Sequence, residues 1–264
     1  MASENRVSRA IYSSERDNTV LQKLSFFKRE KTSRQYRNEW KYRCNNQELG
    51  LLEARLNSIL STDKHSGASG GYSVRSLYFD DYVNTSANQN QAGIPDRFKW
   101  RVRYYGGGTS KHMHLEFKRK RDGRGIKKSC KITEEEFQHV LNGEPEKVLW
   151  NTDEALLRRF CYEIMTRDFR PKVIIDYDRI AYTEPIANIR ITLDKNISVS
   201  YEFNKFLTGD YLKFPLLDAN NHILEVKFDN ILPGYIRNII DSYGMQQASF
   251  SKYYFGRKKL EGLI

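Results

Sequence analysis

A short segment in the middle of the chain carries a basic residue at every second position. The basic residues are Arg97, Lys99, Arg101 and Arg103, and they alternate with Phe98, Trp100, Val102 and Tyr104. Because successive side chains of a β-strand point to opposite faces, the segment predicts a strand with four cations on one face and an apolar set on the other. Four like charges on one face repel one another unless an anion lies against them. The segment therefore indicates an anion-binding surface.

The same alternation of charged and apolar residues recurs in three further segments. Their charged members are Glu39, Lys41, Arg43, His112, His114, Glu116, Lys118, Lys120, Glu225 and Lys227. A single strand of this kind is typical of a solvated sheet face. Its recurrence in four strands favours a β-barrel with a hydrated, charged interior and an apolar exterior covered by helices. Such an interior would suit a polyanion together with a metal ion.

Basic side chains on several strands could bind a chain of phosphates from different walls of this interior. Arginine makes planar two-point contacts with phosphate oxygens, and lysine supplies a compact point charge. Arg101 and Arg103, two residues apart on one strand, would reach adjacent phosphates. The other candidates for substrate binding are Lys41, Lys118, Lys120, Lys128, Lys131, Arg179 and Arg190. For Lys128 and Lys131, half-exposed surface charge is the alternative interpretation.

Carboxylates among these cations are better suited to a metal ion than to phosphate, which they would repel. Magnesium or manganese is typically held by one or two carboxylates together with phosphate and water oxygens. Glu225 is the first candidate for this role, and Glu39 and Glu116 are possible further ligands. Glu39 could equally pair with a neighbouring lysine or arginine.

The length of 264 residues is compatible with one large barrel domain over residues 32–264, preceded by an arm or short helix over residues 1–31. Apolar and charged periodicity predicts eight strands, near residues 36–43, 73–79, 97–105, 112–120, 126–132, 171–182, 188–200 and 222–229. Helices are predicted near residues 46–60, 133–143 and 153–167, and from Pro233 onward. The polar stretch 80–95 is predicted to be a long loop that is functional or mobile.

Composition limits the class of protein. The 44 lysines and arginines exceed the 33 aspartates and glutamates, and the net charge of +11 indicates an anionic partner. The three cysteines are widely spaced and form no CxxC pair, so they predict neither a disulfide framework nor a zinc site. No apolar run approaches the ~20 residues that span a bilayer. We therefore expect a soluble, cytoplasmic protein without a membrane segment.

The ordered set of charged segments resembles the VTC-type polyphosphate polymerase domain of the triphosphate tunnel metalloenzyme (CYTH-like) superfamily. The resemblance covers about residues 34 to 257. The segments that carry it are Glu39 to Tyr42, Ser76 to Asp80, Lys99 to Gly106, Leu115 to Lys120, Arg170 to Tyr182, Ile189 to Asp194, Leu224 to Phe228 and Phe250 to Gly256.

The resemblance implies an α+β fold in which an eight-stranded antiparallel barrel forms a basic tunnel, with helices packed outside. It implies transfer of the terminal phosphate of ATP to a growing polyphosphate chain, with Mn²⁺ or Mg²⁺ as cofactor. By matching position, the catalytic tunnel cations would be Lys41, Arg101, Arg103, Lys118, Arg179 and Lys252. Arg190 would be a further cation, and Glu225 would be the metal ligand.

Three positions depart from the family pattern. Arg37 replaces the first glutamate of a Glu-x-Glu-x-Lys pattern, which fits polymerase-type members better than hydrolytic ones. Lys120 occupies a position that is histidine in other members, and Ser249 one where lysine is expected. Arg97 and Lys99, at the start of their strand, are expected at the tunnel entrance or on the surface.

Two other functions stay open at this point. The first is a tripolyphosphatase or nucleoside triphosphatase that uses the same tunnel with water as acceptor. The second is a noncatalytic protein that binds polyphosphate or nucleic acid. Nucleic-acid binders place exposed aromatic residues among their cations for base stacking. Here the aromatic residues alternate away from the cations, so we expect no nucleic-acid partner.

Overall fold

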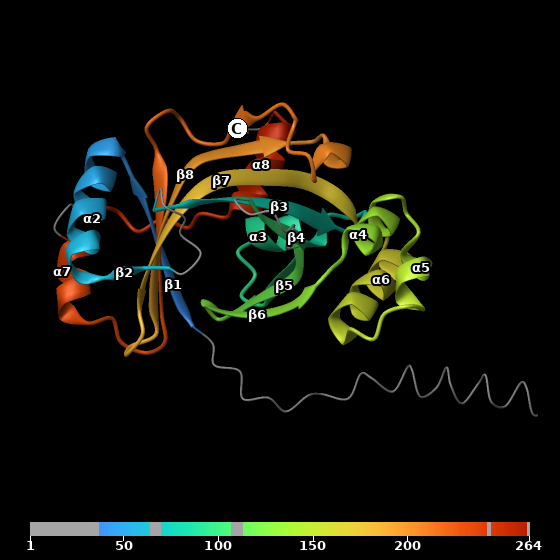
Figure 1. Ribbon diagram of the computed structural model, residues 1–264, viewed down its shortest axis with the longest axis horizontal. Coiled ribbons are helices and arrows are strands. Elements are labelled where there is room, and N and C mark those ends of the chain that lie inside the picture. The colour runs from blue at the N-terminus through green and yellow to red at the C-terminus, as the bar shows by residue number, and fades with distance from the viewer. Residues whose placement is uncertain (1–36, 64–69, 107–112, 242–243, 263–264) are drawn as a thin grey trace, which may run out of the picture. The chain divides into compact units, whose positions relative to one another are not determined.

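The computed structural model describes residues 37–63, 70–106, 113–241 and 244–262 (Figure 1). Contacts divide the chain into Met1–Arg34 and Gln35–Ile264. The predicted arm over residues 1–31 lies outside the described residues and stays a prediction. The rest of this section concerns the second unit.

One antiparallel sheet contains the strands of this unit. They are β1 (Asn38–Cys44), β2 (Ser61–Thr62), β3 (Tyr72–Asp80), β4 (Arg97–Gly106), β5 (Met113–Arg121), β6 (Arg124–Lys131), β7 (Arg170–Glu184), β8 (Ile189–Ser200), β9 (Phe214–Pro215) and β10 (His222–Phe228). Eight of them follow the order β1-β10-β8-β7-β3-β4-β5-β6, while β2 pairs with β7 and β9 with β8.

The sheet is curled, so that its first and last strands approach each other. Arg37, just before β1, and Gly125 of β6 exchange two backbone hydrogen bonds, of 3.4 and 3.2 Å. The predicted α+β fold with an eight-stranded antiparallel barrel is thereby confirmed. The sheet is curled into a half-barrel, and this bridge links its two edges.

Helices cover the outer face of the curled sheet, as predicted (Figure 1). The helices of this unit are α2 (Asn46–Ile59), α3 (Thr85–Gln91), α4 (Glu134–Leu141), α5 (Pro145–Leu149), α6 (Ala155–Arg167), α7 (Gly234–Asp241) and α8 (Lys252–Leu260), with a 3-10 turn η2 (Phe203–Lys205). On the outer face, α2 and α7 pack against β1, β8 and β10, and α4 to α6 pack against β4 to β6. Among the described residues, no helix is both long and apolar enough to cross a lipid bilayer.

Capping residues explain where two of these helices begin. The Asn45 side chain accepts hydrogen bonds from the amides of Gln47 and Glu48, and the Glu48 carboxylate accepts one from the Asn45 amide. Thr133 and Glu136 make the same reciprocal contacts at the start of α4. These starts agree with the helices that the sequence predicts near residues 46–60 and 133–143.

The alternation on β4 separates the two faces as the sequence indicates. Trp100 and Val102 are fully buried in the outer core against α4 to α6. Lys99, Arg101 and Arg103 point to the concave face, where they line a cavity. Burial of the apolar set against helices therefore orients the cations inward.

Two helices define one end of this concave face. The predicted loop 80–95 contains α3, whose amides at Ser86 and Ala87 donate to the Asp80 carboxylate. The Tyr253 hydroxyl of α8 donates to the same carboxylate at 2.5 Å. A Cβ atom at Gly256 would lie 2.5 Å from Ile175 Cδ1, so α8 packs directly on the concave face of β7. Asp80 therefore ties both helices to β3.

Candidate functional site

A charged cavity of about 450 Å³ occupies the concave face. Ten basic and two acidic side chains line it: Lys41, Arg97, Lys99, Arg101, Arg103, Lys118, Lys120, Arg179, Lys227, Lys252, Glu39 and Glu225. They come from β1, β4, β5, β7, β10 and α8, so the charges converge from several walls. The chain contributes a strong excess of positive charge to one enclosed space.

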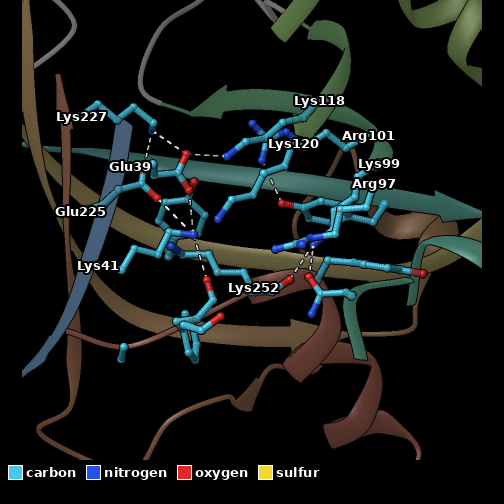
Figure 2. A pocket seen from close by; sticks show the side chains of 18 of the residues that line it. Glu39, Lys41, Arg97, Lys99, Arg101, Lys118, Lys120, Glu225, Lys227 and Lys252 are labelled. Carbon is cyan, nitrogen blue, oxygen red and sulfur yellow. Dashed lines mark hydrogen bonds and ion pairs between the residues drawn. The ribbon is translucent and has the colours of Figure 1, made fainter. Parts of the chain in front are cut away.

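Glu39 and Glu225 form the acidic part of the cavity (Figure 2). Lys41 bridges the two, with its ammonium 2.9 Å from Glu39 and 3.6 Å from Glu225. Lys118 donates to Glu39 at 2.7 Å, and Lys227 donates to Glu225. The antiparallel register of β1 and β10 explains this grouping, because it places Lys41 opposite Glu225 and Glu39 opposite Lys227.

The lysines keep both carboxyl groups ionised. Burial alone would raise the pKa of Glu39, but Lys118 and Lys41 hold it well below its usual range. Lys227 and Lys41 do the same for the pKa of Glu225, against a similar burial effect. For Lys227 burial dominates and lowers its pKa to about 8. A buried carboxylate, Glu225, and a half-buried one, Glu39, therefore face the cavity as anions at neutral pH.

Glu116 lies beside Arg101 on the neighbouring strand β5, on the inner face, but it does not line the cavity. Its carboxylate accepts a hydrogen bond from Arg101 Nε at 2.7 Å and from Lys127 at 2.8 Å, and lies 4.0 Å from Arg103. Burial raises its pKa, but these cations outweigh burial and lower it. Glu116 therefore orients the arginines from the neighbouring strand.

Two tyrosines complete the orientation of these arginines. The Tyr78 hydroxyl accepts from Arg101 at 2.8 Å, and the Tyr177 hydroxyl accepts from Arg103 at 3.2 Å. Ser76 accepts from Arg103 Nε at 3.2 Å. The donors of both guanidinium groups are thus held in fixed directions before any ligand binds.

Asp194 supports a second pair of cations. It accepts two hydrogen bonds from Arg179, at 2.6 and 2.8 Å, and one from Lys252 at 2.6 Å. Burial would raise the pKa of Asp194, but Arg179 and Lys252 lower it to about 2. Arg179 and Lys252 therefore reach the cavity from β7 and α8 with their positions set by one buried anion.

Most of the predicted site residues are brought together. Those that line the cavity are Lys41, Arg101, Arg103, Lys118, Lys120, Arg179, Lys252, Glu39 and Glu225. The other four predicted residues do not line it. Lys128 pairs with Phe117 in the register of β5 and β6, and Phe117 belongs to the outer core, so Lys128 takes the outer face.

The remaining three residues lie on or near the inner face but outside the cavity wall. Lys131 is exposed opposite His114 near the end of β6. Arg190 pairs with Asp63 at 2.6 Å and donates to the Tyr72 hydroxyl. Glu116 is the buried partner of Arg101 described above.

The residues that depart from the family pattern fall into two groups. Lys120 and Ser249 line the cavity, whereas Arg37 pairs with Asp229 at 2.9 Å and donates to the Asn188 carbonyl outside it. Arg37, at the position of the missing glutamate, therefore ties the start of β1 to the loop after β10.

Sequence reasoning missed three features of the site. Lys99, expected at the entrance or surface, is a partly buried residue of the cavity wall. Lys227 belonged to the alternating pattern but was not selected as a site residue. Asp194 lies in one of the segments that carry the family resemblance, yet its pairing with Arg179 and Lys252 depends on strand register and on the placement of α8.

The number and position of the cavity carboxylates decide whether they could hold a divalent metal ion. Across residues 37–63, 70–106, 113–241 and 244–262, no group of three or more acidic, histidine or cysteine side chains is close enough to hold a metal. Glu39 and Glu225 supply two hard oxygen ligands on one side of the cavity. Magnesium and manganese fit such a site when phosphate and water oxygens complete the coordination. Glu116, engaged by Arg101 and Lys127, lies outside this pair.

Several solved structures are similar to this one at low sequence identity. A candidate adenylate cyclase from Bacillus halodurans is 12% identical, with 83% of this chain and 96% of that chain covered and a TM-score of 0.51. A candidate adenylate cyclase from Vibrio parahaemolyticus is 11% identical, covering 84% and 98% at a TM-score of 0.47. The capping enzyme triphosphatase of Mimivirus is 10% identical, covering 86% and 95% at a TM-score of 0.34. The first of these shows a shared fold.

Comparison with known sequences identifies the family. No curated protein matches the chain. The family model of the VTC domain matches residues 36–261, which include every strand of the curled sheet, the cavity wall and α8. The chain therefore belongs to the VTC domain family.

Proposed function

We propose that this protein is a metal-dependent polyphosphate polymerase that transfers the γ-phosphate of ATP to the end of a growing inorganic polyphosphate chain. The observation that carries the proposal is the cavity wall, in which ten basic side chains surround two carboxylates. Membership of the VTC domain family and the tunnel fold support metal-dependent phosphoryl transfer as the class of reaction. The choice of ATP and of a polymeric product rests on the sequence resemblance. We expect the enzyme to act in the cytoplasm, where ATP is available.

The arginines and lysines would act by positioning phosphates and neutralising their charge. Phosphoryl transfer needs little covalent participation from the protein, so catalysis comes mainly from orientation and electrostatic stabilisation. Arg101 and Arg103 are suited to this because Glu116, Tyr78 and Tyr177 already fix their donors.

Cations from other walls would bind the same phosphate groups from different directions. They are Lys41, Lys118, Arg179 and Lys252, on β1, β5, β7 and α8. Lys41 also donates to the Phe250 carbonyl at 2.8 Å, which holds its ammonium at the floor of the cavity. A phosphate chain between these walls would be held along its length and kept in line for transfer.

Glu225 and Glu39 would hold Mn²⁺ or Mg²⁺. The ion would supply positive charge to the phosphate oxygens at the point of transfer. Lys41 and Lys227, which now neutralise the carboxylates, would then be available to the phosphate groups.

The test is to incubate the purified protein with ATP and Mn²⁺, to separate phosphate chains by electrophoresis, and to assay ADP and free phosphate. Glu225→Gln keeps the size of the side chain but removes its charge, and we expect it to lower the rate by more than about 100-fold. Glu135→Gln is the matched control, because Glu135 is exposed on α4, outside the cavity.

Each product pattern selects one function. Long chains together with ADP support the polymerase. Free phosphate and ADP without chains would indicate a tripolyphosphatase or nucleoside triphosphatase in the same cavity. Absence of both products, with unchanged binding of polyphosphate by Glu225→Gln, would leave a noncatalytic binding protein.

A further inference from the structure

Two isoleucines at loop tips are the most exposed large apolar side chains in the described part of the chain. Ile186, in the turn between β7 and β8, is 98% exposed, and Ile231, in the loop between β10 and α7, is 80% exposed. Isoleucine is among the residues most often fully buried in folded proteins. A single apolar residue at the surface is ordinary, but two that protrude together indicate a contact with an apolar partner.

Hydrogen bonds within the β7–β8 turn hold Ile186 outward. The Glu184 carboxylate accepts from the amide of Ile186 at 3.0 Å and from that of Ala187 at 2.6 Å. The Asn188 amide donates to the Pro185 carbonyl at 3.3 Å, and Asn188 has a left-handed backbone φ of 48°. Ala187 packs against the core beneath α2 and α7. The turn is therefore anchored by its other residues, while Ile186 remains in solvent.

The loop after β10 repeats this arrangement. Leu232 is buried in the same core, whereas its neighbour Ile231 is exposed. Asp229 of this loop accepts a hydrogen bond from the Asn188 side chain of the β7–β8 turn at 2.9 Å. The two loops thus lie side by side, at the lower left of Figure 1. Both isoleucines protrude from the same end of the curled sheet.

Arg37 joins a third element to this end, the hairpin between β5 and β6. Its side chain contacts both of the loops that carry the isoleucines, and its backbone pairs with Gly125 of the hairpin. Arg121 and Arg124, on either side of the hairpin turn, are exposed, and Arg121 lies 3.8 Å from Asp122. Four residues at this end are named the tip surface: Ile186, Ile231, Arg121 and Arg124.

Positive charge predominates around the tip surface. Its nearby carboxylates are engaged, because Asp229 pairs with Arg37 and Glu184 accepts from the amides of its own turn. The strands that lead to the tips also carry cations of the cavity, Lys120 on β5 and Lys227 on β10. An anionic surface would therefore be attracted to this end of the protein.

Protruding aliphatic side chains beside exposed arginines suit a lipid bilayer with anionic head groups. The aliphatic tips can insert at the boundary between head groups and acyl chains, and the arginines can bind the phosphates of the head groups. A nucleic acid would leave the isoleucines in water. A two-fold contact with a second copy would bring the arginines of both hairpins close together. The combination of residues therefore favours a membrane surface.

We propose that the tip surface docks the protein peripherally on a lipid bilayer that contains anionic lipids. Ile186 and Ile231 insert below the head groups, and Arg121 and Arg124 bind head-group phosphates. The inference goes beyond the proposed reaction, because none of the four residues lines the cavity.

The experiment measures binding of the purified protein to lipid vesicles by flotation in a density gradient, at several salt concentrations. One set of vesicles contains phosphatidylcholine with phosphatidylglycerol, and the other contains phosphatidylcholine alone. Tripolyphosphate is present in excess, so that lipid head groups cannot bind in the basic cavity instead.

Three double variants separate the contributions to binding. The first combines Ile186→Gln with Ile231→Gln, and the second combines Arg121→Gln with Arg124→Gln. The control combines Leu51→Gln with Leu212→Gln, which replaces two exposed leucines elsewhere, on α2 and in the loop before β9. Thermal unfolding establishes that each variant is folded.

We expect the wild type to bind the anionic vesicles, and the isoleucine variant to bind at least about tenfold more weakly, because two aliphatic side chains no longer insert. The arginine variant should bind at least about fivefold more weakly and depend less on salt. The control variant should bind like the wild type.

A fluorescent label distinguishes insertion from loose association with the bilayer. Cys44, Cys130 and Cys161 are buried, so a nitrobenzoxadiazole dye can be attached selectively to an introduced Ile186→Cys. Its emission should shift to shorter wavelength with anionic vesicles, whereas the same dye at Leu212→Cys should show no shift. A dye at position 186 that stays in water while the protein is bound would contradict insertion.

Two further results would overturn the proposal. The first is a wild-type protein that does not bind anionic vesicles, or an isoleucine variant that binds them equally well. The second is a dimer that forms in the absence of vesicles, with no vesicle binding, and that the isoleucine variant loses, as measured by light scattering. That result would assign the tips to a contact between two copies. Neither outcome depends on the polymerase assay, since vesicle binding is measured without ATP.

Discussion

The Asp194 carboxylate lies 2.6 Å from the Lys252 ammonium and also accepts two hydrogen bonds from Arg179. Asp194 is on β8, Arg179 on β7, and Lys252 is the first residue of α8. One fully buried anion therefore joins two strands to the helix on the concave face and orients two cavity cations. Stability and the geometry of the proposed active site depend on the same contact.

Replacement of Asp194 tests how much this contact contributes to the stability of the protein. Asp194→Asn leaves the charges of Arg179 and Lys252 uncompensated, and we expect it to lower the free energy of unfolding by about 3 kcal/mol. Urea unfolding measures this change. Asp178→Asn, at an exposed carboxylate of the adjacent strand, should change the free energy by less than about 0.5 kcal/mol.

The same contact has a predictable pH dependence. The pKa of Asp194 is lowered to about 2 in the folded protein, below its unfolded value of ~3.9. Its contribution to stability is therefore fully present above the unfolded pKa and is lost as the pH falls toward 2. The difference in stability between the wild type and Asp194→Asn should shrink between about pH 5 and pH 2. A difference that stays constant over this range would contradict the assignment.

Replacing Glu116 should offset the loss of stability caused by replacing Arg101, but it should not restore the turnover lost with Arg101. Arg101→Met removes the partner 2.7 Å from a carboxylate that is 1% exposed, and we expect a loss of about 2–3 kcal/mol. Adding Glu116→Gln should recover much of this loss, because the buried anion is then absent. Turnover should stay low in the double variant, because phosphate still lacks the Arg101 donors. Recovery of turnover together with stability would make Arg101 a structural residue only.

Lys99 should make the binding of long phosphate chains dependent on pH. A bound phosphate would raise the lowered pKa of Lys99, so binding should take up protons and weaken as the pH rises. Calorimetry above pH 8, in two buffers with different ionisation enthalpies, measures the uptake after the ligand itself has lost its terminal proton.

Lys99→Arg provides the control for this pH effect. Arginine stays protonated, so the variant should take up fewer protons than the wild type. The remaining uptake would come from Lys120 and Lys227, whose pKa values are also lowered by burial. An unchanged proton uptake in Lys99→Arg would exclude Lys99 as a source.

The docking of α8 on the sheet can be tested with two glycines. A Cβ atom at Gly256 would lie 2.5 Å from Ile175, 3.2 Å from Val199 and 3.3 Å from Val173. Gly256→Ala should therefore lower the free energy of unfolding by about 1–3 kcal/mol and reduce activity, because α8 carries Lys252. Gly50→Ala is the matched change in α2, where no atom lies within 4 Å. It should raise stability by up to about 1 kcal/mol, through helix propensity alone.

The local sequence pattern was sufficient to predict much of the fold and many of the residues that line the cavity. A period of two on β4 predicts both faces, because the side chains of any strand must alternate and only one face of this one is apolar. Capping residues predict the starts of α2 and α4 for a similar reason, since both partners lie within one turn of helix. Lys128 was expected to bind substrate, but it lies outside the cavity, because its register partner Phe117 is on the outer face.

The sequence by itself determined which residues share a face of each strand, and so it identified Arg101, Arg103, Lys41 and Glu225 as members of one charged interior. The tertiary structure decided which charges are neutralised within that interior. Asp194 meets Lys252 only after α8 has folded onto the sheet, and Lys99 lacks a carboxylate only because Asn90 and Ser251 arrive there instead. Pairing of this kind depends on distances between residues far apart in the chain, which no local period contains.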